Sequence, residues 1–408
     1  MPATWKGSSV TSTTSDRVRR VDIPRVVATL RQALPPSAAP VALHEPRLAG
    51  NEWRYAKECL DTGWVSSAGA FVGRFEEMLA EFTGARRAVA VINGTAALHI
   101  CLLAAGVRPG DEVIVPALTF IATANAVAYC GATPHFADSE MATLGMDPRK
   151  LEEYLRDIAE VKAGTCFNRR TGARIAAVMP MHTFGHPVDL DALNEVCQRF
   201  SLPMVEDAAE SLGSYYKGKH TGNVGRLSAL SFNGNKTVTT GGGGAVLTND
   251  EELGRMVKHV TTTARVPHKW AFLHDQVGYN YRLPNINAAL GCAQMEQLPG
   301  FLRSKRALSE RYQRLFADVS GVRVVTEPAH SRSNYWLNNI LLDAECADQR
   351  DALLQATNES GLMTRPAWTL MHRLPMFREC PRMDLSTAEN IEARLVSIPS
   401  SAVLGEGC

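Results

Sequence analysis

Residues 231–244 read Ser-Phe-Asn-Gly-Asn-Lys-Thr-Val-Thr-Thr-Gly-Gly-Gly-Gly, which sets one lysine, Lys236, between an apolar run and four consecutive glycines. A lysine in tight, partly desolvated surroundings can lose its proton and attack a carbonyl group. Four glycines weaken regular structure and allow a backbone to approach a ligand closely. The stretch therefore predicts a reactive lysine, with a solvated loop lysine as the ordinary alternative.

Short apolar runs alternate with helical stretches around this loop. Strands are expected near residues 88–92, 112–115, 133–136, 175–179, 203–206 and 229–232, and helices at 95–105 and 121–130. Continuous apolar strands separated by helices predict an α/β fold whose mainly parallel sheet is covered on both faces. Ligands of such sheets bind beyond the carboxyl ends of the strands, so the loops after strands are the candidate site.

Two further loops follow predicted strands. Asn93-Gly-Thr-Ala-Ala97 opens a helix, whose backbone N–H groups favour an anion, although Thr95 could also serve only as a helix cap. In Glu206-Asp-Ala-Ala-Glu210, the carboxylate of Asp207 could pair with a protonated heterocyclic nitrogen or cap the next helix. An anchored phosphate, an acidic partner and Lys236, in this chain order, are what pyridoxal phosphate (PLP) requires. Together the three loops predict PLP as the cofactor.

Three segments are expected along the chain. Residues 1–40 form a polar N-terminal extension with one helix, which Asp22 could cap. Residues 41–295 form the large PLP-binding α/β domain. A long charged helix over 294–317 and apolar runs at 322–325 and 338–342 predict a smaller C-terminal α+β domain over 296–408.

Composition and charge exclude several classes of protein. Lys and Arg number 43 and Asp and Glu number 42, so the net charge is +1, which gives no electrostatic footprint for nucleic acid or an anionic membrane. No eighteen apolar residues run together, and the first fifteen residues contain no secretory core. The nine cysteines form no C-x-x-C pair, which favours free thiols in a reducing compartment. A cytoplasmic protein without a metal site is expected.

The three loops belong to a longer set of motifs that resembles a known family. The chain resembles the DegT/DnrJ/StrS family of PLP-dependent sugar-nucleotide aminotransferases, which have the aspartate-aminotransferase fold (fold type I). The match runs in the family's order from about His44 to about Ser400. Besides the loops above, it includes Gly63-Trp-Val-Ser-Ser67, Gly110-Asp-Glu-Val113, Pro116 to Ala126, His182-Thr-Phe-Gly185 and Gly278-Tyr-Asn-Tyr-Arg282.

The resemblance implies roles around the cofactor ring. Lys236 matches the lysine that carries PLP covalently, and Asp207 matches the carboxylate on the pyridine nitrogen. Glu210 occupies the position near the ring hydroxyl, where many relatives have Gln. Phe120 matches the aromatic residue that stacks on the ring, although by itself it would more often be a core aromatic.

The resemblance also implies how the cofactor phosphate is held. Gly94 and Thr95 match the phosphate-binding helix start, and Ser231 matches a hydroxyl on the same phosphate. Asn280 matches an asparagine that reaches the phosphate of the neighbouring subunit. A homodimer with shared active sites is therefore expected.

Five residues are expected to contact the substrate. Ser66 and Ser67 lie in the Gly-Trp-Val-Ser-Ser motif. His182 lies near the site by position, and the equal alternative is a core histidine whose hydrogen bonds are all made inside the protein. His268 and Lys269 lie where a nucleotide diphosphate could run, with a solvated basic loop as the alternative.

Within the family, Asn233-Gly-Asn-Lys236 and Pro267-His-Lys-Trp270 resemble the LegC-type branch. That branch implies transfer of an amino group from glutamate to the keto carbon, C4, of a UDP-4-keto-6-deoxy-N-acetylhexosamine, for legionaminic-acid-type or bacillosamine-type surface glycans. The alternatives are another nucleotide sugar, such as GDP-4-keto-6-deoxymannose (perosamine type), a PLP-dependent sugar dehydratase, and a non-catalytic sensor of the same fold. Dehydratases of this scaffold can lack the lysine, so Lys236 favours transamination.

Overall fold

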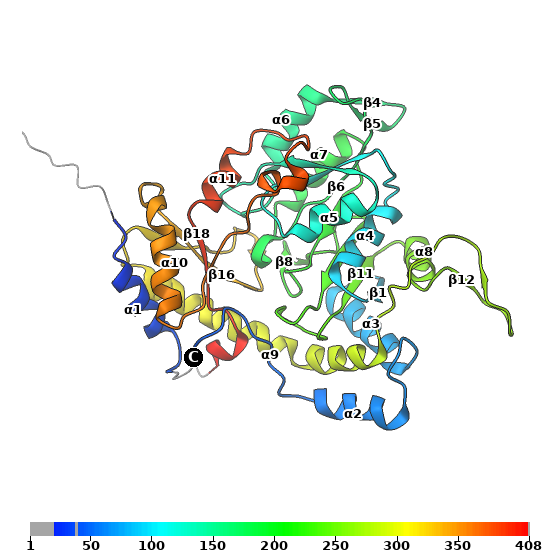
Figure 1. The fold of residues 1–408 in the computed structure, drawn as a ribbon, viewed down its shortest axis with the longest axis horizontal. Coiled ribbons are helices and arrows are strands. Elements are labelled where there is room, and N and C mark those ends of the chain that lie inside the picture. Colours follow the sequence, from blue (N-terminus) through cyan, green and yellow to red (C-terminus); the bar gives the residue numbers. More distant parts are fainter. Residues whose placement is uncertain (1–19, 37–39, 407–408) are drawn as a thin grey trace, which may run out of the picture.

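A seven-stranded sheet forms the centre of the computed structural model, which describes residues 20–36 and 40–406 (Figure 1). Parallel bridges between Val178 and Met204 and between Met181 and Asp207 join its two halves. Only β11 runs antiparallel to its neighbours in this sheet. This arrangement confirms the expected fold type I architecture. The strand order is β1 (Arg87–Val91), β11 (Gly244–Thr248), β10 (Leu227–Ser231), β7 (Val205–Asp207), β6 (Ile175–Val178), β2 (Glu112–Pro116) and β3 (Thr133–Ala137).

Alternate residues of the strands face two helical layers. In β1, Val89 and Val91 join a core with α4 (Gly94–Ala104), α5 (Ile121–Tyr129) and α8 (Glu251–Thr261). Ala88 and Ala90 face the other way, toward α3 (Ala70–Thr83) and the first part of α9 (Asn285–Phe316). Two more helices, α6 (Pro148–Ile158) and α7 (Leu190–Arg199), pack against β2, β3 and β6. The sheet is covered on both faces, as its apolar strands predict.

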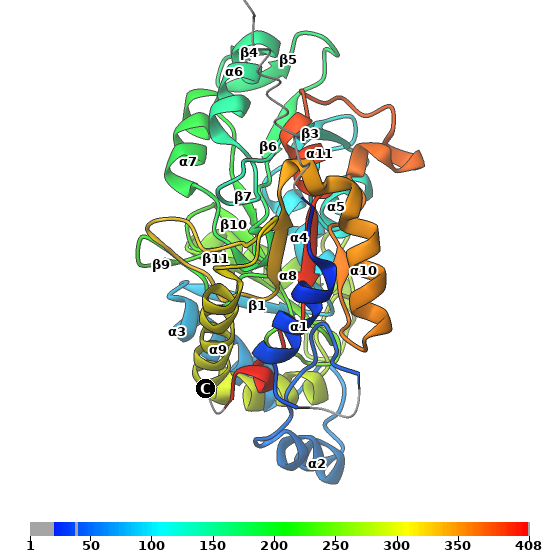
Figure 2. The same cartoon turned by 90° about the vertical axis from the view of Figure 1, so that its left-hand side faces the viewer.

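A second, antiparallel sheet forms the smaller unit. Its order is β14 (Val322–Val324), β16 (Asn338–Leu342), β18 (Leu395–Ile398) and β17 (Arg365–Pro366). Two helices, α1 (Ile23–Ala33) and α10 (Arg350–Glu359), lie side by side against it in both views (Figures 1 and 2). Asp22 caps α1 as expected, since its carboxylate accepts from the N–H of Arg25 at 3.0 Å. Helix α1 thus belongs to the core of the smaller unit.

Helix α9 connects the two units. It begins at Asn285 rather than near residue 294, and it runs through the expected domain boundary at 295–296. Its first part packs Leu298 into the core of the large sheet, and its second part packs Leu308 and Tyr312 into the core of the smaller unit. The units therefore share one rigid element, which fixes the small unit beside the carboxyl ends of the large sheet.

The remaining elements are short or lie at the periphery. They are α2 (Glu52–Thr62), β4 (Ala159–Lys162), β5 (Thr165–Asn168), β8 (Tyr215–Tyr216), β9 (Lys219–His220), β12 (Arg265–Val266), β13 (Leu273–His274), β15 (Ser331–Arg332) and α11 (Ser386–Glu392). The β12–β13 hairpin projects away from the body of the molecule (Figure 1). Within the described residues, no helix is both long and apolar enough to cross a membrane.

Candidate active site

A cavity of about 290 Å³ lies at the carboxyl ends of β7 and β10 and at the start of α4. This is the edge of the sheet at which a parallel α/β fold predicts a ligand. The cavity brings together seven of the residues expected at the site, which are Gly94, Thr95, Phe120, Asp207, Glu210, Ser231 and Lys236.

Close backbone packing shapes the α4 end of the cavity. The side chain of Asn93 caps α4 by accepting from the N–H of Ala96 at 2.8 Å, so the cap is Asn93 rather than Thr95. A Cβ on Gly94 would lie 2.8 Å from the Cβ of Ser231, and one on Gly244 would lie 2.5 Å from the carbonyl of Asn93. Glycine is required at both positions. The result is a cradle of a helix N-terminus and a serine hydroxyl, which suits a phosphate.

Asp207 ends β7 at the floor of the cavity and is buried. Its carboxylate accepts from the hydroxyl of Thr123 at 2.7 Å and from the N–H of Ala209 at 3.2 Å. Burial raises the pKa of Asp207, while these hydrogen bonds and the charge of Lys236 act against the rise. A cationic ring nitrogen beside this carboxylate would favour its ionised form. Asp207 is thus held in place to bind a protonated heterocycle.

Lys236 faces a carboxylate and an indole ring. Its Nζ lies 3.2 Å from Oε1 of Glu210 and 3.9 Å from the centre of the Trp336 ring. The other oxygen of Glu210 accepts from the N–H of Phe184 at 2.9 Å. Burial raises the pKa of Glu210 to about 7, against the opposing effect of Lys236. A carboxyl group that titrates near neutrality beside an amine is suited to hold or release a proton there.

His182 is fully buried and does not line the cavity. Its Nε2 lies 2.9 Å from Oε2 of Glu206, and its Nδ1 accepts from the N–H of Val188 at 3.3 Å. Both ring nitrogens are satisfied inside the protein. This placement supports the core-histidine alternative over contact with substrate.

The other predicted residues lie away from the cavity of their own chain. The carbonyl of Ser66 accepts from the N–H of Asn285 at the start of α9, and Ser67 follows in the same turn. His268 and Lys269 lie on the β12–β13 hairpin. Asn280 is exposed just beyond the hairpin, and its Oδ1 accepts from Nε of Arg282 at 3.0 Å. The described chain alone does not bring these five side chains to the cavity.

Two tryptophans of the cavity were not predicted from the sequence. Trp336 precedes β16, and Trp368 follows β17. The indole N–H of Trp336 donates to the carbonyl of Asn235 at 2.7 Å, which anchors the lysine loop to the smaller unit. Trp336 lies 100 and Trp368 lies 132 positions beyond Lys236, and neither belongs to a recognised motif. Only the packing of the two units reveals them.

Comparison with known proteins agrees with this geometry. Residues 46–407 match the model of the DegT/DnrJ/EryC1/StrS aminotransferase family. The chain belongs to this family. It is a PLP-dependent sugar aminotransferase, as the resemblance implied.

Relatives and solved structures cover nearly the whole chain. GDP-perosamine synthase of Caulobacter vibrioides is 37% identical over 90% of this chain and 94% of its own length. GDP-perosamine synthase of Escherichia coli O157:H7 is 38% identical over 88% of this chain and 93% of its own. The structure of Helicobacter pylori PseC, an aminotransferase involved in the biosynthesis of pseudoaminic acid, superposes with a TM-score of 0.79 at 26% identity. That superposition covers 89% of this chain and 94% of PseC.

The residues of the cavity fit PLP. The cradle formed by Gly94 and Ser231 leaves no room for a larger side chain at the helix start but offers donors to a phosphate. Phe120 is 48% exposed at the cavity, which leaves its ring available for stacking. The carboxylate of Asp207 and the amine of Lys236 are groups of the kind that the ring nitrogen and the aldehyde of PLP require.

Proposed function

We propose that this family member transfers the amino group of glutamate to the C4 keto carbon of a nucleotide-linked 4-keto-6-deoxy hexose. The observation that carries the proposal is the meeting of Lys236, Asp207 and the α4 cradle around one cavity. The two GDP-perosamine synthases favour GDP-4-keto-6-deoxymannose as the sugar. The LegC-type motifs favour a UDP-4-keto-6-deoxy-N-acetylhexosamine as the second candidate.

The side chains support transamination in distinct ways. PLP, when bound, supplies an electron sink that lets the amino group pass from donor to acceptor in two half-reactions. Lys236 would hold the cofactor through its Nζ, and the same amine, when free, would hold or move a proton beside the substrate. Asp207 keeps the ring nitrogen protonated. Glu210 lies within reach of Lys236 to return its proton. The presence of Lys236 disfavours the dehydratase alternative.

The cellular setting is also part of the proposal. Apart from Cys346, the described cysteines are seven free thiols, six of which are buried, and this supports a reducing compartment. We place the reaction in the cytoplasm, on the way to a surface glycan, with a homodimer as the working unit.

A substrate panel tests the sugar. Purified enzyme, PLP and glutamate are incubated with GDP-4-keto-6-deoxymannose, UDP-4-keto-6-deoxy-N-acetylglucosamine and the TDP-linked keto sugar, and the products are identified by mass spectrometry. We expect the keto oxygen of a GDP- or UDP-linked sugar to be replaced by an amine. Loss of a sugar hydroxyl without gain of nitrogen would instead show a dehydratase.

Mixing two inactive chains tests the shared site. Asn280 does not line the cavity of its own chain, which supports a contact with the neighbour's phosphate. We expect Lys236→Ala and Asn280→Ala to be impaired separately and to regain activity together, because one site of the heterodimer then receives both changes and the other none. Random exchange makes about half of the dimers heterodimers, so recovery should approach about a quarter of wild-type turnover.

Labelled subunits provide the control for the mixing experiment. Demonstrated exchange without recovered activity would show that Asn280 does not complete the partner's site. The activities of the two separate mutants, measured at the same concentrations, are subtracted as the background.

A further inference from the structure

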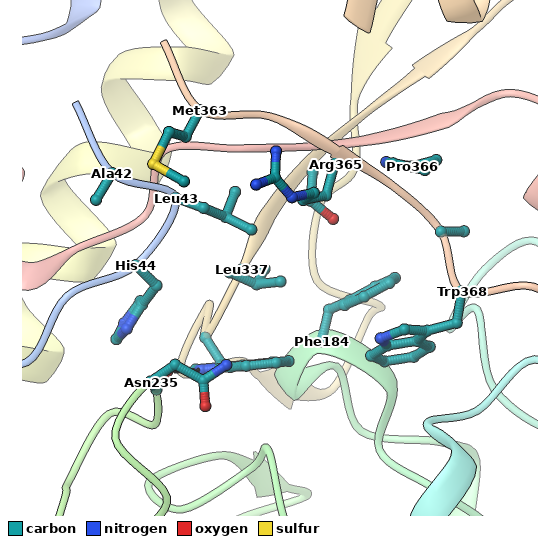
Figure 3. A pocket seen from close by; sticks show the side chains of 13 residues that line it. Ala42, Leu43, His44, Phe184, Asn235, Leu337, Met363, Arg365, Pro366 and Trp368 are labelled. Carbon is teal, nitrogen blue, oxygen red and sulfur yellow. Dashed lines mark hydrogen bonds between the residues drawn. The ribbon is translucent and has the colours of Figure 1, made fainter. Parts of the chain in front are cut away.

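A second cavity, of about 460 Å³, adjoins the PLP cavity (Figure 3). We call it the aromatic cavity. Three residues, Asn235, Trp336 and Trp368, line both cavities. Because the ring of Trp336 lies 3.9 Å from Nζ of Lys236, a ligand that fills the aromatic cavity ends beside this amine.

The walls of the aromatic cavity are mainly apolar. Phe184 and Trp368 stack with ring centres 4.7 Å apart and 27° between their planes, and Figure 3 shows the pair on one side of the cavity. Leu337 and Met363 complete the apolar lining. Aromatic and aliphatic faces with a few polar groups suit a ligand that has both a C–H face and hydroxyl groups, as a hexose does.

The polar groups of the aromatic cavity do not suit glutamate. Arg365 is the one charged side chain among the residues that line it. Arg365 is exposed, and its Nη1 already donates to Oδ1 of Asn358 at 3.2 Å and to the carbonyl of Thr364 at 2.8 Å. A dicarboxylate needs cationic partners that face the ligand, so the neutral sugar is the better occupant.

His44 supplies a polar group to the aromatic cavity, and the buried Lys305 fixes which of its ring nitrogens carries the proton. Lys305, on α9, is fully buried, and its Nζ lies 2.9 Å from Nε2 of His44, 3.2 Å from the carbonyl of Trp336 and 2.5 Å from that of Ser400. Within the described residues no carboxylate pairs with Lys305. An ammonium has three donors and no acceptor, so Nε2 of His44 accepts from it. The proton of the neutral imidazole is then on Nδ1.

Nδ1 of His44 has no hydrogen-bond partner among the described residues, although it is buried. The backbone of Asn235 lies close enough to the ring to raise the pKa of His44, but it forms no hydrogen bond of normal geometry with Nδ1, and its carbonyl accepts from the indole N–H of Trp336 at 2.7 Å. Burial and the charge of Lys305 lower the pKa of His44, which keeps the ring neutral. A buried donor without an acceptor is costly, and this ring lines the aromatic cavity beside Asn235 (Figure 3).

We propose, resting on the function proposed above, that His44 positions the hexose of the nucleotide sugar by donating a hydrogen bond from Nδ1 to a sugar oxygen, and that Lys305 fixes the tautomer that provides this donor. His44 is therefore a substrate-positioning residue of the aromatic cavity. Lys305 acts through His44 and touches no substrate.

Separate measurement of the two half-reactions tests the role of His44. His44→Phe keeps a ring but removes the donor, and His44→Asn keeps an N–H near the position of Nδ1. His372→Phe is the matched control, since His372 is also partly buried with an unpartnered Nδ1 but lines neither cavity. Burial lowers the pKa of Lys305 to about 7, so the rates are measured at about pH 6, where its ammonium form prevails.

We expect His44→Phe to lower kcat/KM for the keto sugar by about 10- to 100-fold, mainly through KM. The same variant should carry out the half-reaction with glutamate at a rate within about threefold of wild type, which also shows that it is folded. His44→Asn should recover most of the loss. Equal losses in both half-reactions, or no loss with the sugar, would overturn the inference while the proposed function stands. A wild type that aminates neither keto sugar would remove the proposed function and the inference with it.

Discussion

Lys236→Ala is expected to lower turnover with glutamate and keto sugar by about 10⁴-fold or more, because the change removes both the covalent hold on the cofactor and the proton-transfer group. The side chain is largely buried between Glu210 and Trp336, and among the described residues no other lysine lines the cavity. Single-turnover spectra of the half-reaction with glutamate give the measurement. Retention of more than about a hundredth of the wild-type rate would show that a group other than Lys236 transfers the proton.

The matched control for Lys236→Ala is Lys217→Ala. Lys217 is exposed and pairs with Asp191 at the surface. Its loss should leave both half-reactions unchanged, because an exposed ion pair contributes little to the fold.

Asp207→Asn is expected to slow both half-reactions by about 10²- to 10³-fold. A neutral amide can keep the hydrogen bond of Thr123 but cannot hold the proton on a ring nitrogen. The fold and some cofactor binding should survive, because the shapes of the two side chains are alike. Rates within about tenfold of wild type, a difference of only about 1.4 kcal/mol, would show that Asp207 is not the partner of the ring nitrogen.

Asp189→Asn provides the control for Asp207→Asn. Asp189 caps α7 by accepting from the N–H of Ala192, and asparagine is an equally good cap. The change also removes one negative charge, but outside the cavity. Unaltered rates of Asp189→Asn would show that the slowing in Asp207→Asn comes from the position of Asp207 in the cavity, not from the loss of a negative charge alone.

The strands of the large sheet could be predicted because their apolar runs are continuous and lie between helices. β11 was not predicted, since it begins at the last of four glycines, a residue type that weakens strand patterns. The structure shows why glycine is needed there: Gly244 lies against the backbone of Asn93. A requirement of this kind arises between distant segments and leaves no local periodicity.

The start of α9 and the division between the units could not be predicted from the sequence. The helix begins after Pro284, where Asn285 binds the turn at Ser66. The same helix then serves two cores, so no change in composition marks a boundary near residue 295. Shared elements of this type are defined by tertiary packing alone.

That residues following different strands line one cavity could be predicted, because parallel strands bring their carboxyl ends together. Gly94, Asp207 and Lys236 line one cavity for this reason. His44 and Trp336 were missed as site residues, since they come from segments far apart in the sequence that meet only when the smaller unit docks. Packing, rather than motif, brings them together.

Reduction with borohydride followed by peptide mapping is the most direct test that this chain is a PLP enzyme with Lys236 as its reactive lysine. The purified protein, loaded with PLP and reduced, should carry one pyridoxyl group on the peptide that contains Lys236. Lys236→Ala protein, loaded and reduced as a separate parallel sample, should carry no label on the corresponding peptide. A pyridoxyl group on any other lysine, or an unlabelled wild-type protein after loading, would contradict the account.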